Sequence, residues 1–189
     1  PYIADDREHL VRILNSDAVY SMFDEMEEHM GARGIGAFYY GARYLTTKDK
    51  PVSGPEDMKG LNIRVPDQKL YIDTLTAMGA VATPMAFSEV FLSLQQGVID
   101  GQENPIETLY NFQYYDVQDY VTISNHLCTA GAVVCNNAWY EGLSDEFKAA
   151  VDKAAQVAEA YSIEELNSSE SEVLSLLAEK MQVTELTEE

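Results

Sequence analysis

The chain is predicted to be an α/β protein built mainly on parallel strands. Three successive strand-to-helix units carry this prediction: the strands cover residues 61–65, 80–85 and 98–100, and a segment with helical spacing of apolar residues follows each. Units in this order form parallel sheets with right-handed crossovers. The carboxyl ends of the three strands should therefore lie side by side.

Two helices are predicted before these units. The first covers residues 5–14, and the second carries apolar residues at helical spacing and ends at Gly31. An aromatic-rich strand follows over residues 34–40. A polar, turn-forming stretch over residues 46–60 then leads into the first unit.

The helices of the three units have recognisable start and stop signals. Asp67 is placed to cap the first of them, and Gly79 should end it. The second is expected after Ser88 and the third after Pro105.

A further strand over residues 128–135 leads to a long helix that Ser144 should cap. If this helix covers residues 145–181, it is ~55 Å long at 1.5 Å per residue, which exceeds a domain of this size. It should therefore bridge two lobes or be broken, and residues 167–169 (Asn-Ser-Ser) are where a break is expected.

Charge excludes several classes of partner. The chain has 12 basic and 32 acidic residues and a formal charge of −20, which argues against nucleic acid or an anionic membrane. No run approaches the ~18 apolar residues of a membrane span, so direct membrane insertion is not expected, and no signal segment opens the chain. No arginine follows Arg64, which makes that residue conspicuous.

Cysteine and histidine indicate no cofactor or metal. Cys128 and Cys135 lie seven positions apart in one predicted strand, ~20 Å when extended, so two free thiols are expected. His9, His29 and His126 lack the spacing of a metal site or a catalytic base.

The strand ends bring together the groups of a small-molecule site. Arg64 closes the first strand, Phe87 follows the second and Asn104 follows the third. A guanidinium binds a carboxylate as a fork, and apolar walls with a few polar groups are typical of ligand pockets. Plainer roles remain open, namely a structural ion pair for Arg64, a core position for Phe87 and a helix cap for Asn104.

Three motifs resemble the solute-binding proteins of tripartite ATP-independent periplasmic (TRAP) transporters, of the DctP type. They are Pro-Glu-Asp-Met-Lys-Gly-Leu-Asn-Ile-Arg-Val-Pro at 55–66, Thr-Pro-Met-Ala-Phe-Ser-Glu-Val at 83–90 and Leu-Gln-Gln-Gly-Val-Ile-Asp-Gly-Gln-Glu-Asn-Pro at 94–105. The resemblance implies a two-lobed fold of the periplasmic binding protein type (class II-like), with mainly parallel sheets, flanking helices and a long interlobe helix.

The same resemblance implies a division into lobes. Residues 1–41 would form part of the first lobe, 42–127 the second lobe with the ligand-contacting strand ends, 128–165 the return to the first lobe, and 166–189 the end of the long helix and the return to the second. The chain is shorter than the family's usual length, and we expect an incomplete amino-terminal lobe without its first strands, the signal peptide and the last helix.

Roles for four residues follow from the resemblance. Arg64 would pair with the ligand carboxylate, Asn104 would contact the ligand and Phe87 would line the site. Arg43 matches a second arginine of the family in a Gly-x-Arg context.

The resemblance implies a periplasmic protein that captures a small organic acid and delivers it to the membrane subunits of a TRAP permease. The segments Arg64-Val65-Pro66-Asp67 and Leu70-Tyr71 are more similar to members that take sugar acids, such as uronates or aldonates, than to those that take C4-dicarboxylates. We expect no enzymatic activity, no cofactor and a monomer when the protein is complete.

Two other functions are weighed against this one. An α/β enzyme acting on a carboxylate substrate lacks a Gly-x-Ser-x-Gly motif, a phosphate loop, and cysteine or histidine at the strand ends. Asp100 and Glu103 would be a weak acid/base pair. An interaction module assembled through the carboxyl-terminal helix lacks a sustained heptad seam.

Overall fold

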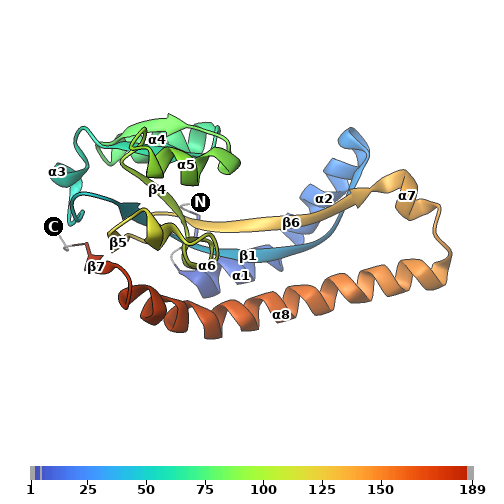
Figure 1. Ribbon diagram of the computed structural model, residues 1–189. Coiled ribbons are helices and arrows are strands. Elements are labelled where there is room, and N and C mark those ends of the chain that lie inside the picture. The colour runs from blue at the N-terminus through green and yellow to red at the C-terminus, as the bar shows by residue number, and fades with distance from the viewer. Residues whose placement is uncertain (1–2, 5, 187–189) are drawn as a thin grey trace. The chain divides into compact units, whose positions relative to one another are not determined.

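The protein's structure is a computed structural model that describes residues 3–4 and 6–186 (Figure 1). Its helices are α1 (Arg7–Leu14), α2 (Asp17–Met30), α3 (Pro55–Met58), α4 (Lys69–Ala77), α5 (Val90–Gln95), α6 (Ile106–Asn111), α7 (Asn137–Glu141) and α8 (Asp145–Ala178), with the 3₁₀ turns η1 (Phe87–Glu89) and η2 (Tyr114–Asp116). Its strands are β1 (Ala32–Thr47), β2 (Asn62–Val65), β3 (Val81–Pro84), β4 (Gly101–Pro105), β5 (Tyr120–Ile123), β6 (Cys128–Asn136) and β7 (Gln182–Glu185).

Contacts divide the chain into two compact units. The first takes the described residues up to Gly41 together with Leu127–Ser169, and the second takes Ala42–His126 together with the described residues from Glu170 onward. Strand β1 and helix α8 each contribute residues to both units. Neither unit is therefore a continuous stretch of sequence.

The second unit is organised around a mixed sheet in which β3, β2, β4, β1, β5 and β7 lie in that order. Strand β2 runs parallel to both β3 and β4, and β7 runs parallel to β5, whereas β4 and β5 are antiparallel to β1. The α/β class is confirmed, and the strands that carry the three motifs are neighbours in one sheet.

Apolar side chains from β2 and α4 meet in the core of the second unit. Ile63 and Val65 alternate with Arg64 along β2 and are fully buried, as is Leu75 of α4. Burying each such side chain contributes ~1.5–3 kcal/mol relative to leaving it exposed. The core cluster consists of Leu45, Val52, Met58, Ile63, Val65, Leu75 and Ala80.

Strand β4 approaches β1 so closely that its first residue has to be glycine. A Cβ atom on Gly101 would lie 2.2 Å from the carbonyl oxygen of Thr46. The next three residues, Gln102, Glu103 and Asn104, are at most 5% exposed. Because buried polar groups need hydrogen-bond partners, this strand requires partners from elsewhere in the unit.

Two predicted boundaries around these strands are wrong. Residues 98–100 form a bend, and the strand begins only at Gly101. Strand β1 continues to Thr47, into the stretch 46–60 that was expected to turn. The last residues of β1 are held by pairing with β4 on one edge and β5 on the other, and local sequence pattern does not display such non-local pairing.

Capping residues account for some of the helix ends. Helix α1 follows Asp6, whose carboxylate accepts a backbone hydrogen bond of 2.7 Å from the first turn. Helix α2 ends at Gly31, which has the left-handed φ of 62° that glycine tolerates. The predicted cap at Asp67 is wrong, because α4 begins one residue later, after Gln68, and has no side-chain cap.

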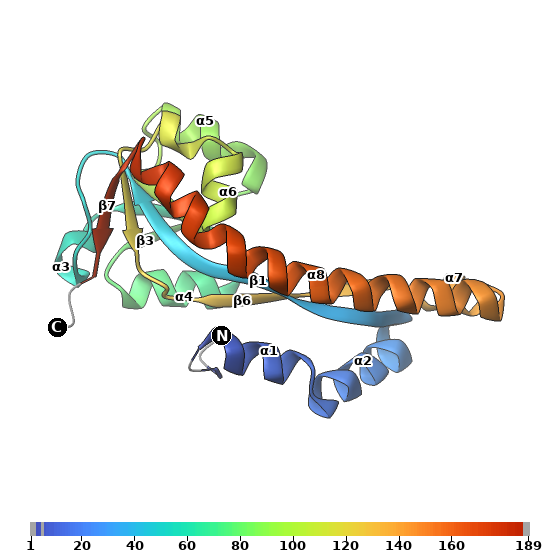
Figure 2. The same cartoon turned by 90° about the horizontal axis from the view of Figure 1, so that it is seen from below.

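Helix α8 runs over 34 residues without interruption, ~51 Å at 1.5 Å per residue (Figure 2). The Ser144 hydroxyl accepts a hydrogen bond from the backbone N–H of Phe147 at 3.4 Å, which supports the predicted cap. The predicted break at residues 167–169 is wrong, since the helix continues through all three positions.

The first unit packs α1 and α2 against the first part of β1. Strand β6 pairs with β1, and the Thr129 hydroxyl donates a hydrogen bond of 2.9 Å to the carbonyl oxygen of Gly41. Cys128 and Cys135 of β6 are free thiols. The buried apolar cluster of this unit consists of Leu10, Leu14, Phe23, Ala37 and Tyr39.

Candidate ligand-binding site

Arg64 lies near the end of β2 and holds the chain just after β3. The strand registers place it opposite Thr83 of β3 and Gln102 of β4. The residue is 3% exposed, and its Nε and Nη2 atoms donate hydrogen bonds of 3.0 and 2.7 Å to the carbonyl oxygen of Met85. The guanidinium therefore fixes the chain within the second motif, between β3 and Phe87.

The Arg64 guanidinium keeps unused hydrogen-bonding capacity. Of its five N–H donors, two are directed at Met85, which leaves three on Nη1 and Nη2. Within the described part of the chain, Arg64 forms no ion pair with a carboxylate, so the structural ion-pair role is not what the structure shows. Burial lowers its pKa, the charge of Glu103 raises it, and the nearby Arg43 lowers it. Arginine nevertheless stays protonated, so a buried charge with free donors results.

Arg43, on β1, is in the opposite situation because Glu103 neutralises it. The Arg43 Nε atom is paired with Glu103 Oε2, and Nη2 donates to Glu103 Oε1 at 2.9 Å and to the Glu103 carbonyl oxygen at 2.8 Å. The Arg43 guanidinium carbon lies 5.0 Å from the centre of the Tyr71 ring. Both charged side chains are nearly inaccessible, at 4% and 0%. The pair joins β1 to β4.

Asn104 is oriented by its neighbours. Its Oδ1 accepts a hydrogen bond of 3.1 Å from Arg43 Nη2, and its Nδ2 donates one of 2.6 Å to Gln102 Oε1. Gln102 in turn donates to the Thr46 hydroxyl at 2.9 Å. Helix α6 begins after Pro105 without a side-chain cap, so the cap role for Asn104 is wrong. One amide N–H of Asn104 remains for another acceptor.

Phe87 is an exposed ring beside Arg64. The residue is 38% exposed, so the core role is wrong for it. The Arg64 guanidinium carbon lies 5.8 Å from the ring centre, which is within cation–π range. The turn held by the Met85 carbonyl thus places an aromatic surface next to a buried cation.

The carboxylates of this region do not form an acid/base pair. Glu103 is engaged by Arg43 and lies 3.4 Å from His126 Nε2. The Asp100 carboxylate instead accepts two hydrogen bonds from Asn62, at 2.7 Å from the backbone N–H and 3.1 Å from the side chain. Among the described residues there is also no cluster of histidine, cysteine and carboxylate that could hold a metal ion.

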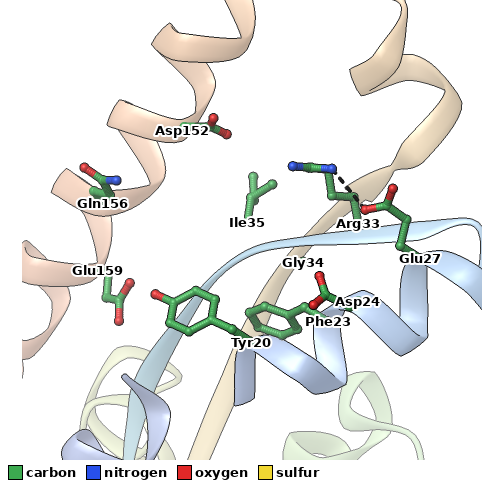
Figure 3. Close-up of a pocket in the computed structure, with 10 residues that line it drawn as sticks. All are labelled: Tyr20, Phe23, Asp24, Glu27, Arg33, Gly34, Ile35, Asp152, Gln156 and Glu159. Atoms are coloured by element: carbon green, nitrogen blue, oxygen red, sulfur yellow. Dashed lines mark hydrogen bonds and ion pairs between the residues drawn. The ribbon is translucent and has the colours of Figure 1, made fainter. Parts of the chain in front are cut away.

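A cavity in the first unit differs in charge (Figure 3). Arg33 is the one cation among its lining residues and is paired with Glu27 at 3.0 Å. Figure 3 shows the Tyr20 hydroxyl directed toward Glu159, whose pKa is raised by burial. A surface this acidic disfavours an anion. The cavity has a volume of about 280 Å³ and is lined by Tyr20, Phe23, Asp24, Glu27, Arg33, Gly34, Ile35, Asp152, Gln156 and Glu159.

The four predicted site residues all belong to the second unit. Arg43 contacts Asn104 directly and Arg64 lies next to Phe87, so they form two adjoining pairs. Sequence reasoning missed Glu103 as the partner of Arg43. One signal could have found it: a carboxylate in a segment bounded by apolar residues needs a buried cation.

The sequence matches one protein family over its whole length. The family described as "Bacterial extracellular solute-binding protein, family 7" (DctP) matches residues 1–189. The chain belongs to this family. DctP proteins bind substrates for transport and are not enzymes, which sets aside the enzyme alternative.

Individual DctP relatives take different acids. The chain is 38% identical over 156 residues to the sialic acid-binding periplasmic protein SiaP of Vibrio cholerae, covering 82% of this chain and 48% of SiaP. It is 33% identical over 154 residues to the C4-dicarboxylate-binding periplasmic protein DctP of Rhodobacter capsulatus, covering 82% of this chain and 46% of that protein. The chain thus spans about half the length of the curated relatives it matches.

A solved structure agrees with the fold. A TRAP periplasmic solute-binding protein from Roseobacter denitrificans with bound L-galactonate has a TM-score of 0.89 and 34% identity, over 98% of this chain and 62% of that one. The fold class predicted from the sequence is therefore confirmed for the part that the chain covers. Among the described residues, no helix combines the length and the apolar character needed to cross a bilayer.

Proposed function

We propose that this chain is part of a periplasmic solute-binding protein that captures a small organic acid and delivers it to the membrane subunits of a TRAP permease. The two compact units correspond to the lobes of such a protein. The acid binds in the second unit, with Arg64 as the residue that holds its carboxylate.

The observation that carries this proposal is the unsatisfied guanidinium of Arg64. Its Nη1 and Nη2 donors can form a two-pronged contact with a carboxylate, while Met85 holds the rest of the group in place. A buried cation without a counter-ion is costly, and an anionic ligand removes that cost. Arg43 offers no comparable charge because Glu103 already pairs with it.

The remaining site residues have smaller roles in this proposal. Asn104 donates its free amide hydrogen to a ligand oxygen, which contributes ~1 kcal/mol. Phe87 covers an apolar part of the ligand. Arg43 orients Asn104 and keeps its two Nη1 donors for a ligand, but it offers no net charge because Glu103 compensates it.

A sugar acid is the preferred ligand class. SiaP binds sialic acid and the R. denitrificans protein holds L-galactonate, and both ligands combine one carboxylate with several hydroxyl groups. One free cationic fork together with a free amide donor suits such a molecule. A C4-dicarboxylate, as taken by the R. capsulatus relative, would need a second cation for its second carboxylate.

Isothermal calorimetry and thermal shift with L-galactonate, succinate and pyruvate test the proposal. We expect one class of acid to bind without turnover and to stabilise the protein by about 2.7 kcal/mol at a hundredfold excess over the Kd. In Arg64→Ala the affinity for that acid should fall at least ~100-fold, because a desolvated carboxylate loses its charged partner. Arg64→Lys should recover only part of the loss, since an ammonium cannot form the fork.

Arg12→Ala is the matched control, because Arg12 is an exposed residue of α1 in the other unit. Its affinity for the acid should equal that of the unchanged chain. A loss below about fivefold in Arg64→Ala, ~1 kcal/mol, would show that Arg64 does not hold the carboxylate.

A further inference from the structure

A second phenylalanine stands next to Phe87 at the candidate site. Phe112, at the end of α6, is 52% exposed, and its ring meets that of Phe87 edge to face with centroids 4.8 Å apart. Phe87 itself lies 5.8 Å from the Arg64 guanidinium carbon. Exposed rings beside a buried cation form a surface with one apolar part and one charged part. A ligand that has both an acid group and a C–H-rich face matches it.

Phe112 is supported by a buried tyrosine. Its ring stacks on Tyr114, with centroids 6.4 Å apart and an interplanar angle of 27°, and Phe91 stacks on Tyr114 at 6.4 Å. Tyr114 is 1% exposed, and burial raises its pKa to about 12, so its phenol is neutral under working conditions. Phe112 is therefore a ring with a fixed support and an open surface, rather than a loose side chain.

The backbone at Gln113 is the device that stacks these rings. Gln113 has φ 55° and ψ 37°, in the left-handed region that residues with long side chains seldom adopt. It lies between Phe112 and Tyr114 and turns the chain from α6 into η2. Such backbone conformations persist where the surroundings demand them, and they gather at functional sites.

The chemistry of two adjacent rings discriminates between acids. The C–H groups along the carbon chain of a sugar acid lose little hydration free energy when they contact an aromatic ring. A second carboxylate in the same place would be desolvated without gaining a hydrogen-bond donor. Discrimination by the rings acts on the part of the ligand next to the carboxylate that Arg64 holds.

We propose that Phe112 is a specificity-determining residue, and that it forms with Phe87 an apolar wall that favours sugar acids over dicarboxylates. This inference rests on the proposed function, because it needs the carboxylate to be held at Arg64. It assigns the choice between ligand classes to a residue outside the three motifs of the sequence.

The test measures the Kd of the 189-residue chain for L-galactonate and for succinate by NMR titration at millimolar acid. Phe112→Ala should weaken L-galactonate binding by about fivefold or more, as expected for losing part of an aromatic contact, and change succinate binding less than about twofold. Phe112→Tyr should keep the preference and Phe112→Leu should lose part of it. Phe147→Ala is the control, since Phe147 is an exposed ring, 63% accessible, in the other unit.

Each result decides between the two proposals. Equal effects of Phe112→Ala on both acids, or no effect on either, would overturn the role of Phe112. If Arg64→Ala abolishes binding of both acids in the same titration, the proposed function stands even when the Phe112 result is negative. Unchanged binding of both acids in Arg64→Ala would reject the proposed function itself.

Discussion

Among single residues, the two buried arginines of the second unit differ in what surrounds them. Arg43 has a carboxylate partner in Glu103, whereas Arg64 is held by the backbone carbonyl of Met85 and lies beside the Phe87 ring. Both occur in recognisable sequence contexts, so composition and motif predicted that they matter. Which of them is neutralised could not be predicted, because the Arg43–Glu103 contact joins residues 60 positions apart.

Glu103→Gln tests the stability that this ion pair gives. Glutamine keeps the shape of the side chain but leaves the Arg43 charge buried without its counter-ion, so we expect the free energy of unfolding to fall by ~3–5 kcal/mol. Urea denaturation followed by circular dichroism measures it.

Glu56→Gln serves as the control for that variant. Glu56 pairs with Lys59 at 2.7 Å, but its side chain is 83% exposed, so the change should stay within ~0.5 kcal/mol. Similar losses of unfolding free energy in the two variants would mean that the buried Arg43–Glu103 pair contributes no more stability than an exposed pair.

Tyr114 gives the protein a predicted loss of stability at alkaline pH. Burial raises its pKa from 10 to about 12. The folded state therefore holds the phenolic proton more tightly than the unfolded state. The resulting stabilisation is complete below about pH 10 and is lost as the pH rises through 12, for a total of ~2–3 kcal/mol.

Comparison with Tyr114→Phe isolates this contribution. The variant keeps the ring and lacks the hydroxyl, so its free energy of unfolding should fall less steeply between pH 9 and 12. Denaturant titrations at each pH give both curves. Parallel curves for the two proteins would exclude Tyr114 as the source of the slope.

At the scale of secondary structure, the local sequence pattern predicted the strands correctly where the buried residues are apolar. The strands around Ile63 and Ala82 were found because apolar residues and prolines bound them. The predicted position of strand β4 was wrong by a few residues, because polar residues such as Gln102 and Glu103 are not typical of a buried strand. These two buried side chains are hydrogen-bonded to Thr46 and Arg43, which are too distant in the sequence for a local pattern to include them.

In helix α8, too, the structure differs from what the local sequence favours. Asparagine and serine at 167–169 favour an end or a cap, yet the helix continues through them. A weak local preference of a few tenths of a kcal/mol per residue does not outweigh the packing of a helix this long. Leu177, fully buried near its end, is one of the contacts that retain it.

Ser171→Pro tests whether the helix is continuous. In an unbroken α8 this exposed position is interior, and proline should cost ~3 kcal/mol because it removes a backbone hydrogen bond and clashes with the preceding turn. If the helix were broken at 167–169, residue 171 would lie in a first turn, where proline is tolerated.

Ser171→Ala is the reference for that measurement. Alanine should leave stability unchanged or raise it by less than ~0.5 kcal/mol. Thermal unfolding of both variants distinguishes the cases. If the melting temperature of Ser171→Pro is close to that of Ser171→Ala, the helix is broken at residues 167–169 and the continuous α8 is wrong.

For the molecule as a whole, net charge is the dominant long-range property. The formal charge of −20 makes the folded chain repel itself, and salt screens that repulsion. We expect the midpoint of thermal unfolding to rise when sodium chloride is added, and potassium chloride to act equally. A midpoint that falls or stays constant with salt would mean that local ion pairs outweigh the overall charge.

The pairing of β7 with β5 has a consequence for how the chain is made. Val121 lies opposite Val183, so about a third of this chain must be synthesised between the two halves of this ladder. Residues 42–126 can begin to fold on the ribosome while the backbone edge of β5 is still bare, and a bare edge recruits other strands. The moment of greatest aggregation risk should thus fall during synthesis of α8. Ribosome-stalled chains that end just before and just after β7 would show it as a difference in chaperone occupancy.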